Sequence, residues 1–138
     1  MLNETDVIGA VSLDFLQRGY SILEKCTVDS NDVDIVASWP ESGAKMFISA
    51  VGVPRSSAGK EEPEASCTES QIFYCISRAI IGAMGMKDSC KFSPGDRLAL
   101  AFPDTPGFRE QLRAQEPFLN SFGVEVFLVN EEKKIEKL

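Results

Sequence analysis

The 138-residue sequence contains no histidine. This absence excludes a histidine general base, and with it the Ser-His-Asp and Cys-His arrangements of nucleophilic catalysis. It also excludes zinc sites that mix cysteine and histidine ligands. The four cysteines, Cys26, Cys67, Cys75 and Cys90, lack the C-x-x-C spacing of a zinc knuckle. We therefore expect reduced, mostly buried thiols, with a zinc site made from all four cysteines as the alternative.

Basic residues are also scarce, because 14 Lys and Arg face 21 Asp and Glu, which gives a formal net charge of −7. Proteins that grip DNA unaided usually neutralise several phosphates with Lys and Arg. The overall negative field repels nucleic acid, although a local basic patch remains compatible with it. We expect nucleic acid to be bound weakly or through a partner.

Long hydrophobic runs are missing too, since no apolar stretch approaches the roughly 20 residues that a membrane span needs. The first residues, MLNETD, are polar and acidic, whereas a secretory signal is basic and then apolar. The expected location is the cytoplasm, without membrane contact. With 43% apolar residues, a chain of this length is expected to form one domain, over residues 1–130.

Hydrophobic periodicity predicts an α/β fold of order αβββαβαβ, with helices on both faces of a mixed five-stranded sheet. The predicted helices cover residues 4–18, 68–86 and 106–122, and the predicted strands cover residues 20–26, 33–39, 45–53, 97–102 and 124–129. Short connections favour an antiparallel meander of the first three strands, and the helical crossovers favour parallel pairing of the later ones. We expect Pro117 to break or kink the third helix. Residues 55–67 are predicted to be a mobile loop, and residues 131–138 a charged tail.

Residues 32–54 form the stretch around which the predicted sheet is organised. Alternation along the third strand places Phe47, Ser49 and Val51 on one face. Asp34 lies within the otherwise apolar second strand. A carboxylate in that position is costly unless it has a partner or a metal.

The chain resembles the PD-(D/E)XK superfamily, which has the restriction-endonuclease-like fold. The resemblance covers about residues 7–130 and is carried by the segments FLQRGY, VDIVA, FISAVG and LALAFPDTP. In that superfamily an Asp closes one strand and a Glu-x-Lys triplet lies on the next. Asp34 matches the Asp, but the triplet falls on Ser49-Ala50-Val51, so the second acid and the lysine are absent. The resemblance therefore implies this fold with a degenerate active site.

Phosphodiester cleavage with Mg²⁺ needs carboxylates that hold the ion and usually a lysine that activates water. The missing groups have candidate replacements in Glu69, at the start of the second helix, and in Lys45 or Lys60. A carboxylate in the first helical turn is, however, most often there for the helix dipole. Asp34 has two interpretations: a relic hydrogen-bonded to Ser49 or to a backbone amide, or a weak metal ligand.

The second predicted helix carries two further candidates, because Gln71 and Tyr74 lie on the face that would look toward the cleft. Thr68 and Gln71 also form a capping box, which gives Gln71 a structural role. This helix is apolar on nearly all sides, which is typical of a helix buried on more than one side. We therefore predict a protein partner or self-association, as in a homodimer, through Phe73 and Ile81.

These observations favour a non-catalytic protein of restriction-endonuclease-like fold that acts as a protein-binding or regulatory subunit and needs no cofactor. The region from LALAFPDTP to FLVN is similar to the controlling factors for excision of DNA elements, which implies a role in a DNA-related process. The alternative is a Mg²⁺-dependent nuclease with a rearranged site built from Asp34, Glu69 and a lysine.

Overall fold

The computed structural model of the chain describes residues 2–25, 33–52, 68–89 and 94–138. Within these ranges the elements are α1 (Glu4–Gln17), β1 (Ser21–Lys25), β2 (Ile35–Ser38), β3 (Lys45–Ala50), α2 (Glu69–Ser89), β4 (Arg97–Pro103), α3 (Pro106–Ser121), β5 (Val124–Val129) and β6 (Ile135–Lys137). The predicted loop of residues 55–67, which includes Lys60, lies outside the described residues. Cys26, Cys67 and Cys90 lie outside them as well, so the predicted state of these thiols stays a prediction.

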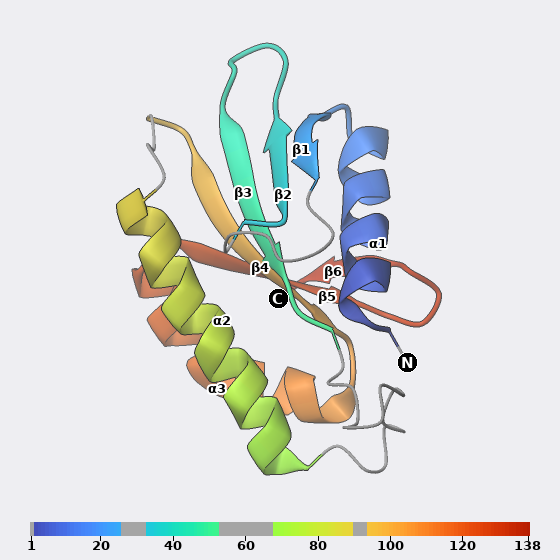
Figure 1. Cartoon of the computed structure of the whole chain (residues 1–138), viewed down its shortest axis with the longest axis vertical. Helices are drawn as coiled ribbons and strands as arrows, with labels where there is room; N and C mark the ends of the chain where they lie inside the picture. Colours follow the sequence, from blue (N-terminus) through green and yellow to red (C-terminus); the bar gives the residue numbers. More distant parts are fainter. Residues whose placement is uncertain (1, 26–32, 53–67, 90–93) are drawn as a thin grey trace.

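The strands form one open mixed sheet with the order β1-β2-β3-β4-β5-β6 (Figure 1). The pairs β1/β2 and β2/β3 are antiparallel, which confirms the predicted meander. The pairs β3/β4 and β4/β5 are parallel and are connected through α2 and α3, which confirms the predicted pairing of the later strands. The α/β class and the presence of helices on both faces are therefore as predicted.

The sheet has six strands rather than the predicted five, because part of the charged tail over residues 131–138 forms β6 against β5. Backbone pairing with β5 holds this short strand, and two ion pairs flank it: Arg109 with Glu136 at 2.7 Å and Lys137 with Glu125 at 2.9 Å. Three residues with two charges show no hydrophobic alternation. The partners that fix them come from α3 and β5, so the local sequence does not reveal the strand.

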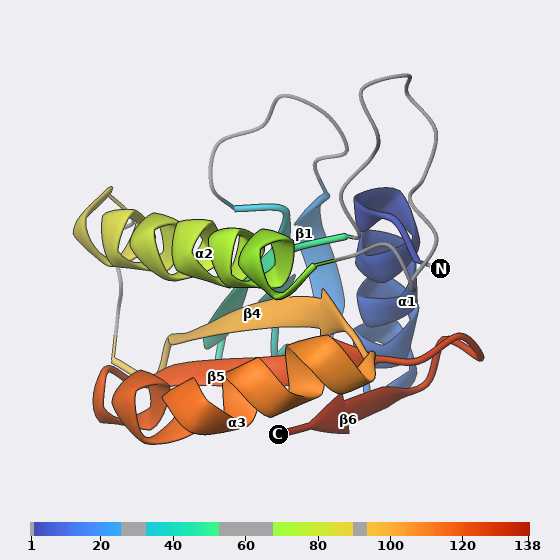
Figure 2. The same cartoon turned by 90° about the horizontal axis from the view of Figure 1, so that it is seen from below.

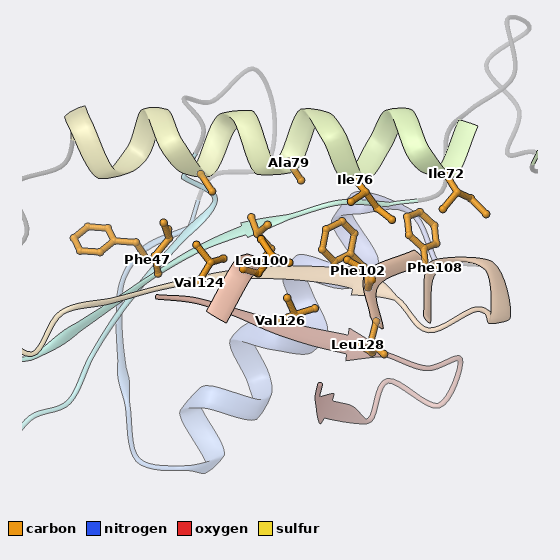
Figure 3. Close-up of a cluster of buried hydrophobic side chains, with 14 of the residues drawn as sticks. Phe47, Ile72, Ile76, Ala79, Leu100, Phe102, Phe108, Val124, Val126 and Leu128 are labelled. Carbon is orange, nitrogen blue, oxygen red and sulfur yellow. The ribbon is translucent and has the colours of Figure 1, made fainter. Parts of the chain in front are cut away.

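Two hydrophobic layers lie on the two faces of the sheet. α1 covers one face, and α2 and α3 together cover the other (Figure 1). Figure 2 shows α2 running beside β4 and α3 beside β5. In β4, Leu98, Leu100 and Phe102 point toward α2 and α3, whereas Ala99 and Ala101 point toward α1. Figure 3 shows the layer beneath α2 and α3, with the buried residues of α2 directed at the sheet. The alternation of large and small side chains in LALAF thus lets α1 approach its face closely.

The helix starts follow the sequence. The Asn3 side chain accepts a hydrogen bond from the Asp6 backbone amide at 2.8 Å, and the Asp6 carboxylate accepts one from Asn3 in return. Thr105 caps α3, with Pro106 at its first position. Of the two predicted effects of Pro117, a break of the helix is wrong, because α3 continues through it to Ser121, and a kink stays a prediction. Pro117 is solvent-exposed, so water can bond the carbonyl that loses its helical partner.

Candidate functional site

Asp34 lies immediately before β2, one step beyond the pairing of Ile35 with Ile48, so that it stands opposite Ser49 on β3. Its side chain is 5% exposed. The carboxylate accepts a hydrogen bond from the Ala50 backbone amide at 2.7 Å and a longer one from the Ser49 hydroxyl at 3.4 Å. Both contacts are those expected of an Asp34 held by hydrogen bonds within the protein.

Val51 is the position to which the sequence resemblance assigns a lysine. Its side chain is half-buried and packs against the hydrophobic layer beneath α2. Its backbone amide donates to the carbonyl of Ala101 at 2.8 Å, which extends the pairing of β3 with β4 beyond the end of the strand. Position 51 therefore contributes packing and no positive charge to the surroundings of Asp34.

The start of α1 lies against the end of β3 at Gly52. A Cβ atom at position 52 would collide with the backbone of Asn3 and Glu4, so only glycine fits there. This close approach brings Glu4 toward Asp34. Although Glu4 is solvent-exposed, partial burial raises the pKa of its carboxyl, and the negative charge of Asp34 raises it further.

Arg78 of α2 acts on Glu4 in the opposite direction and lowers its pKa, although burial and Asp34 outweigh it. The charges of Asp34 and Arg78 thus act on Glu4 in opposite directions. Asp34 was predicted from the sequence as a site residue, whereas Glu4 and Arg78 were not. No local pattern marks them, because the effect of both charges on Glu4 depends on how α1 lies relative to β2 and α2.

The other predicted ligands are not brought to Asp34. Lys45 is exposed at the opposite end of β3, where its backbone amide donates to Asp96 at 2.9 Å. Five residue steps along the strand lead from it to Ala50, a distance of roughly 17 Å. Glu69 lies at the start of α2 and lines a pocket with residues of α3. In the parts of the chain that the structure describes, no three Cys, Asp or Glu side chains are grouped to hold a metal ion.

Gln71 and Tyr74 have different surroundings. The Gln71 side chain accepts from the Thr68 amide at 2.8 Å, and the Thr68 hydroxyl accepts from the Gln71 amide at 3.1 Å, which confirms the predicted capping box. Tyr74 is exposed, with the Arg78 guanidinium 5.7 Å from its ring centre. Tyr74 therefore faces the solvent side of α2.

Helix α2 has one buried and one exposed apolar face. The buried face packs on the sheet and consists of Ile72, Ile76, Ala79 and Ala83. The exposed face, here named the outer face of α2, consists of Phe73 (62% exposed), Tyr74 (61%), Ile81 (69%) and Met84 (45%). Tyr74 and Ile81 are seven positions apart, or about two turns, and so lie on the same side of the helix. Phe73 lies directly beside Tyr74 on that side. The two predicted interface residues, Phe73 and Ile81, thus belong to one exposed surface.

A pocket of about 450 Å³ opens between the first turns of α2 and α3. Its lining, here named the α2–α3 pocket, consists of Glu69, Ser70, Phe73, Gly107, Glu110 and Gln111. The Gln111 side chain donates to the Glu69 carbonyl at 3.1 Å and so ties the two helix starts together. Phe73 belongs both to this pocket and to the outer face of α2.

Comparisons with known protein families, with curated proteins and with solved structures each find no match to this chain. Among the described residues, no helix is both long and apolar enough to span a bilayer. What the structure establishes is an α/β fold with three helices and a mixed six-stranded sheet over the described ranges.

Proposed function

We propose that this chain is a degenerate member of the PD-(D/E)XK superfamily that acts by binding another protein chain rather than by cleaving phosphodiesters. The arrangement of elements supports the superfamily: a helix, an antiparallel meander, and two parallel strands reached through helices. The position of Asp34 opposite Ser49 on neighbouring strands supports it further. The expected setting, by resemblance, is a DNA-related process in the cytoplasm.

The absence of cleavage is inferred from the groups around Asp34. Its carboxylate is bonded by the Ala50 amide, and the positions of the catalytic acid and lysine carry Ser49 and Val51. Removing one positioned electrostatic group commonly costs a factor of about 10² to 10³ in rate. Loss of both the acid and the lysine should therefore remove most of the cleavage rate, and the remaining Asp34 carboxylate is hydrogen-bonded within the protein.

The outer face of α2 is the observation that carries the binding function. Four large apolar side chains on one helix face remain exposed, whereas the opposite face is buried in the core. Contiguous exposed apolar surface of this kind marks protein interaction sites. Aromatic residues and Met, which make up three of the four, are enriched in interfaces.

Light scattering after size exclusion, from low to high micromolar concentration, tests whether the partner is a second copy. If the partner is a second copy, self-association is lost in the double variant Phe73→Ser, Ile81→Ser and kept in Leu13→Ser, Leu16→Ser, which removes exposed apolar side chains from α1. A clean monomer at high micromolar concentration removes the homodimer and leaves a different protein as the partner.

A second candidate is the Mg²⁺-dependent nuclease with a rearranged site. One feature favours it: the charge of Asp34 acts on the Glu4 carboxyl, so Glu4 is a candidate for the second acid that β3 lacks. Glu4 would then take the role predicted for Glu69. Within the described residues Lys45 is too distant to serve as the cation, so this candidate ranks second.

A further inference from the structure

We propose that the α2–α3 pocket receives an arginine or lysine side chain from a basic segment of a different protein, and that this contact anchors the partner at one end of the outer face of α2. The inference rests on the proposed binding function and specifies the chemistry of the partner. It starts from the pocket lining, in which Glu69 and Glu110 are acidic and Phe73 is aromatic.

The charges in the pocket select a cation. Each helix start presents backbone amides that favour an anion. Glu69 and Glu110 oppose that preference with two full negative charges, and none of the six lining residues is basic. A phosphate or carboxylate ligand would have to overcome both carboxylates, whereas a guanidinium or ammonium is attracted by them.

Phe73 adds a contact that suits the same ligand. It lines the pocket while 62% of its surface remains exposed, so its ring is available to a partner. A cation over an aromatic face is attracted by the ring quadrupole, and arginine makes this contact most often. The combination of two carboxylates and one exposed ring therefore fits a side chain that is both charged and flat.

The rest of the molecule favours a different chain over a second copy as the source of this side chain. Two copies would each bring a net charge of −7 to the interface, and like charges repel. A basic partner is attracted at long range and is then held by the apolar side chains of the outer face. Phe73 joins the two parts, because it belongs to both.

The test uses N-acetylarginine amide as a probe, followed by ¹H–¹⁵N NMR of the full chain. Its control is N-acetylcitrulline amide, which has nearly the same shape but no charge. We expect saturable shifts confined to residues 69–73 and 107–111, with clearly weaker shifts from the citrulline compound. Raising the salt concentration should weaken binding of the arginine compound, because the carboxylates of Glu69 and Glu110 are exposed and salt screens their charge.

Variants sharpen the test. Glu69→Gln and Glu110→Gln should each lower the affinity for the arginine probe by roughly two- to fivefold, which is the range for an exposed ion pair. Phe73→Leu should weaken it by a similar factor of about two to five through the lost ring contact. Glu116→Gln, which removes the same charge from α3 outside the pocket, should leave binding unchanged.

Equal binding of both compounds, shifts scattered over the acidic surface, or stronger binding of inorganic phosphate at the pocket would each overturn the inference. So would probe binding that survives the double variant Glu69→Gln, Glu110→Gln. If the outer face still binds a partner while the arginine probe does not bind, the pocket assignment fails and the proposed function stands. If neither partner binding through the outer face nor probe binding in the pocket is observed, the proposed function and the pocket assignment both fail.

Discussion

The carboxylate of Asp34 accepts a 2.7 Å hydrogen bond from the backbone amide of Ala50 across the β2–β3 pair. The Ser49 hydroxyl donates to the same oxygen, Oδ2, at 3.4 Å. The bond from Ala50 also satisfies an amide near the end of β3, where the strand meets the start of α1. The Asp34 carboxylate therefore links the start of β2 to the end of β3.

Replacement of Asp34 should therefore destabilise the fold. Asp34→Ala leaves the buried Ala50 amide without this acceptor, and we expect a loss of about 1–3 kcal/mol in the free energy of unfolding. Asp34→Asn keeps an acceptor oxygen and should lose only about 1 kcal/mol. Urea unfolding followed by circular dichroism measures both. Equal stability of Asp34→Ala and the unchanged protein would show that the bond carries no weight.

Gly52→Ala should be more harmful than its size suggests. The added methyl group collides with the backbone of Asn3 and Glu4, and backbone cannot move aside as a flexible side chain can. We expect a loss of at least about 1–3 kcal/mol, as for overpacking of a core. Chemical denaturation measures the change, and NMR shifts in the first turn of α1 report its displacement.

Gly9→Ala in α1 is the matched control. A Cβ at position 9 meets nothing within 4 Å, and the site is inside a helix. Alanine should stabilise the protein there by about 0.5–1 kcal/mol through helix propensity. A Gly52→Ala variant as stable as Gly9→Ala would contradict the close contact between β3 and α1.

The Glu4 carboxyl should titrate above its usual value near 4.5. Asp34→Asn removes one cause of that increase and should lower the pKa of Glu4, whereas Arg78→Gln removes the opposing charge and should raise it further. Side-chain carboxyl NMR of Glu4 follows each titration. Shifts of the Glu4 pKa in the same direction in both variants would contradict the opposite effects of Asp34 and Arg78 on this carboxyl.

The raised pKa also links Glu4 to stability. Protonated Glu4 is favoured in the folded state, so its contribution is fully present below about 4.5 and is lost as the pH rises through the folded pKa. Glu4→Gln should flatten the dependence of unfolding free energy on pH in that window. An unchanged dependence would indicate that Glu4 is no more desolvated when folded than when unfolded.

Divalent ions should bind weakly or not at all. The Asp34 carboxylate is bonded by the Ala50 amide. We therefore expect that titration with Mg²⁺ or Mn²⁺ shows no saturable binding that depends on Asp34 or Glu4, as judged by the variants Asp34→Asn and Glu4→Gln. Calorimetry and assays with single-stranded, duplex and branched DNA measure this directly. Saturable binding that both substitutions abolish, together with cleavage, would establish the nuclease alternative instead.

Much of the fold was predictable because its signals are local. Alternation of apolar residues marks β3 and β4, and the caps at Asn3, Thr68 and Thr105 place the helix starts. The lack of a polar face on α2 indicated a second apolar face. Each of these features depends on residues that are close together in the sequence, so the sequence alone is enough to predict it.

Other features depend on contacts between distant segments. The strand β6 is fixed by Arg109 and Glu125, which lie on α3 and β5. The approach of Glu4 to Asp34 requires α1 to meet β3 at Gly52. The acidic pocket requires α2 and α3 to start side by side. Glu69 was identified by its place at a helix start, but its neighbours Glu110 and Gln111 were not predicted.

Photo-crosslinking in the source cell is the most direct test of protein binding through the outer face of α2. A benzoylphenylalanine at position 81 probes that face, and one at position 13 is the control, because Leu13 on α1 is an apolar residue of similar exposure. We predict a discrete crosslinked species from position 81, lost in Phe73→Ser, and none from position 13. Crosslinks from position 81 no stronger than those from position 13 would contradict a protein-binding role for α2.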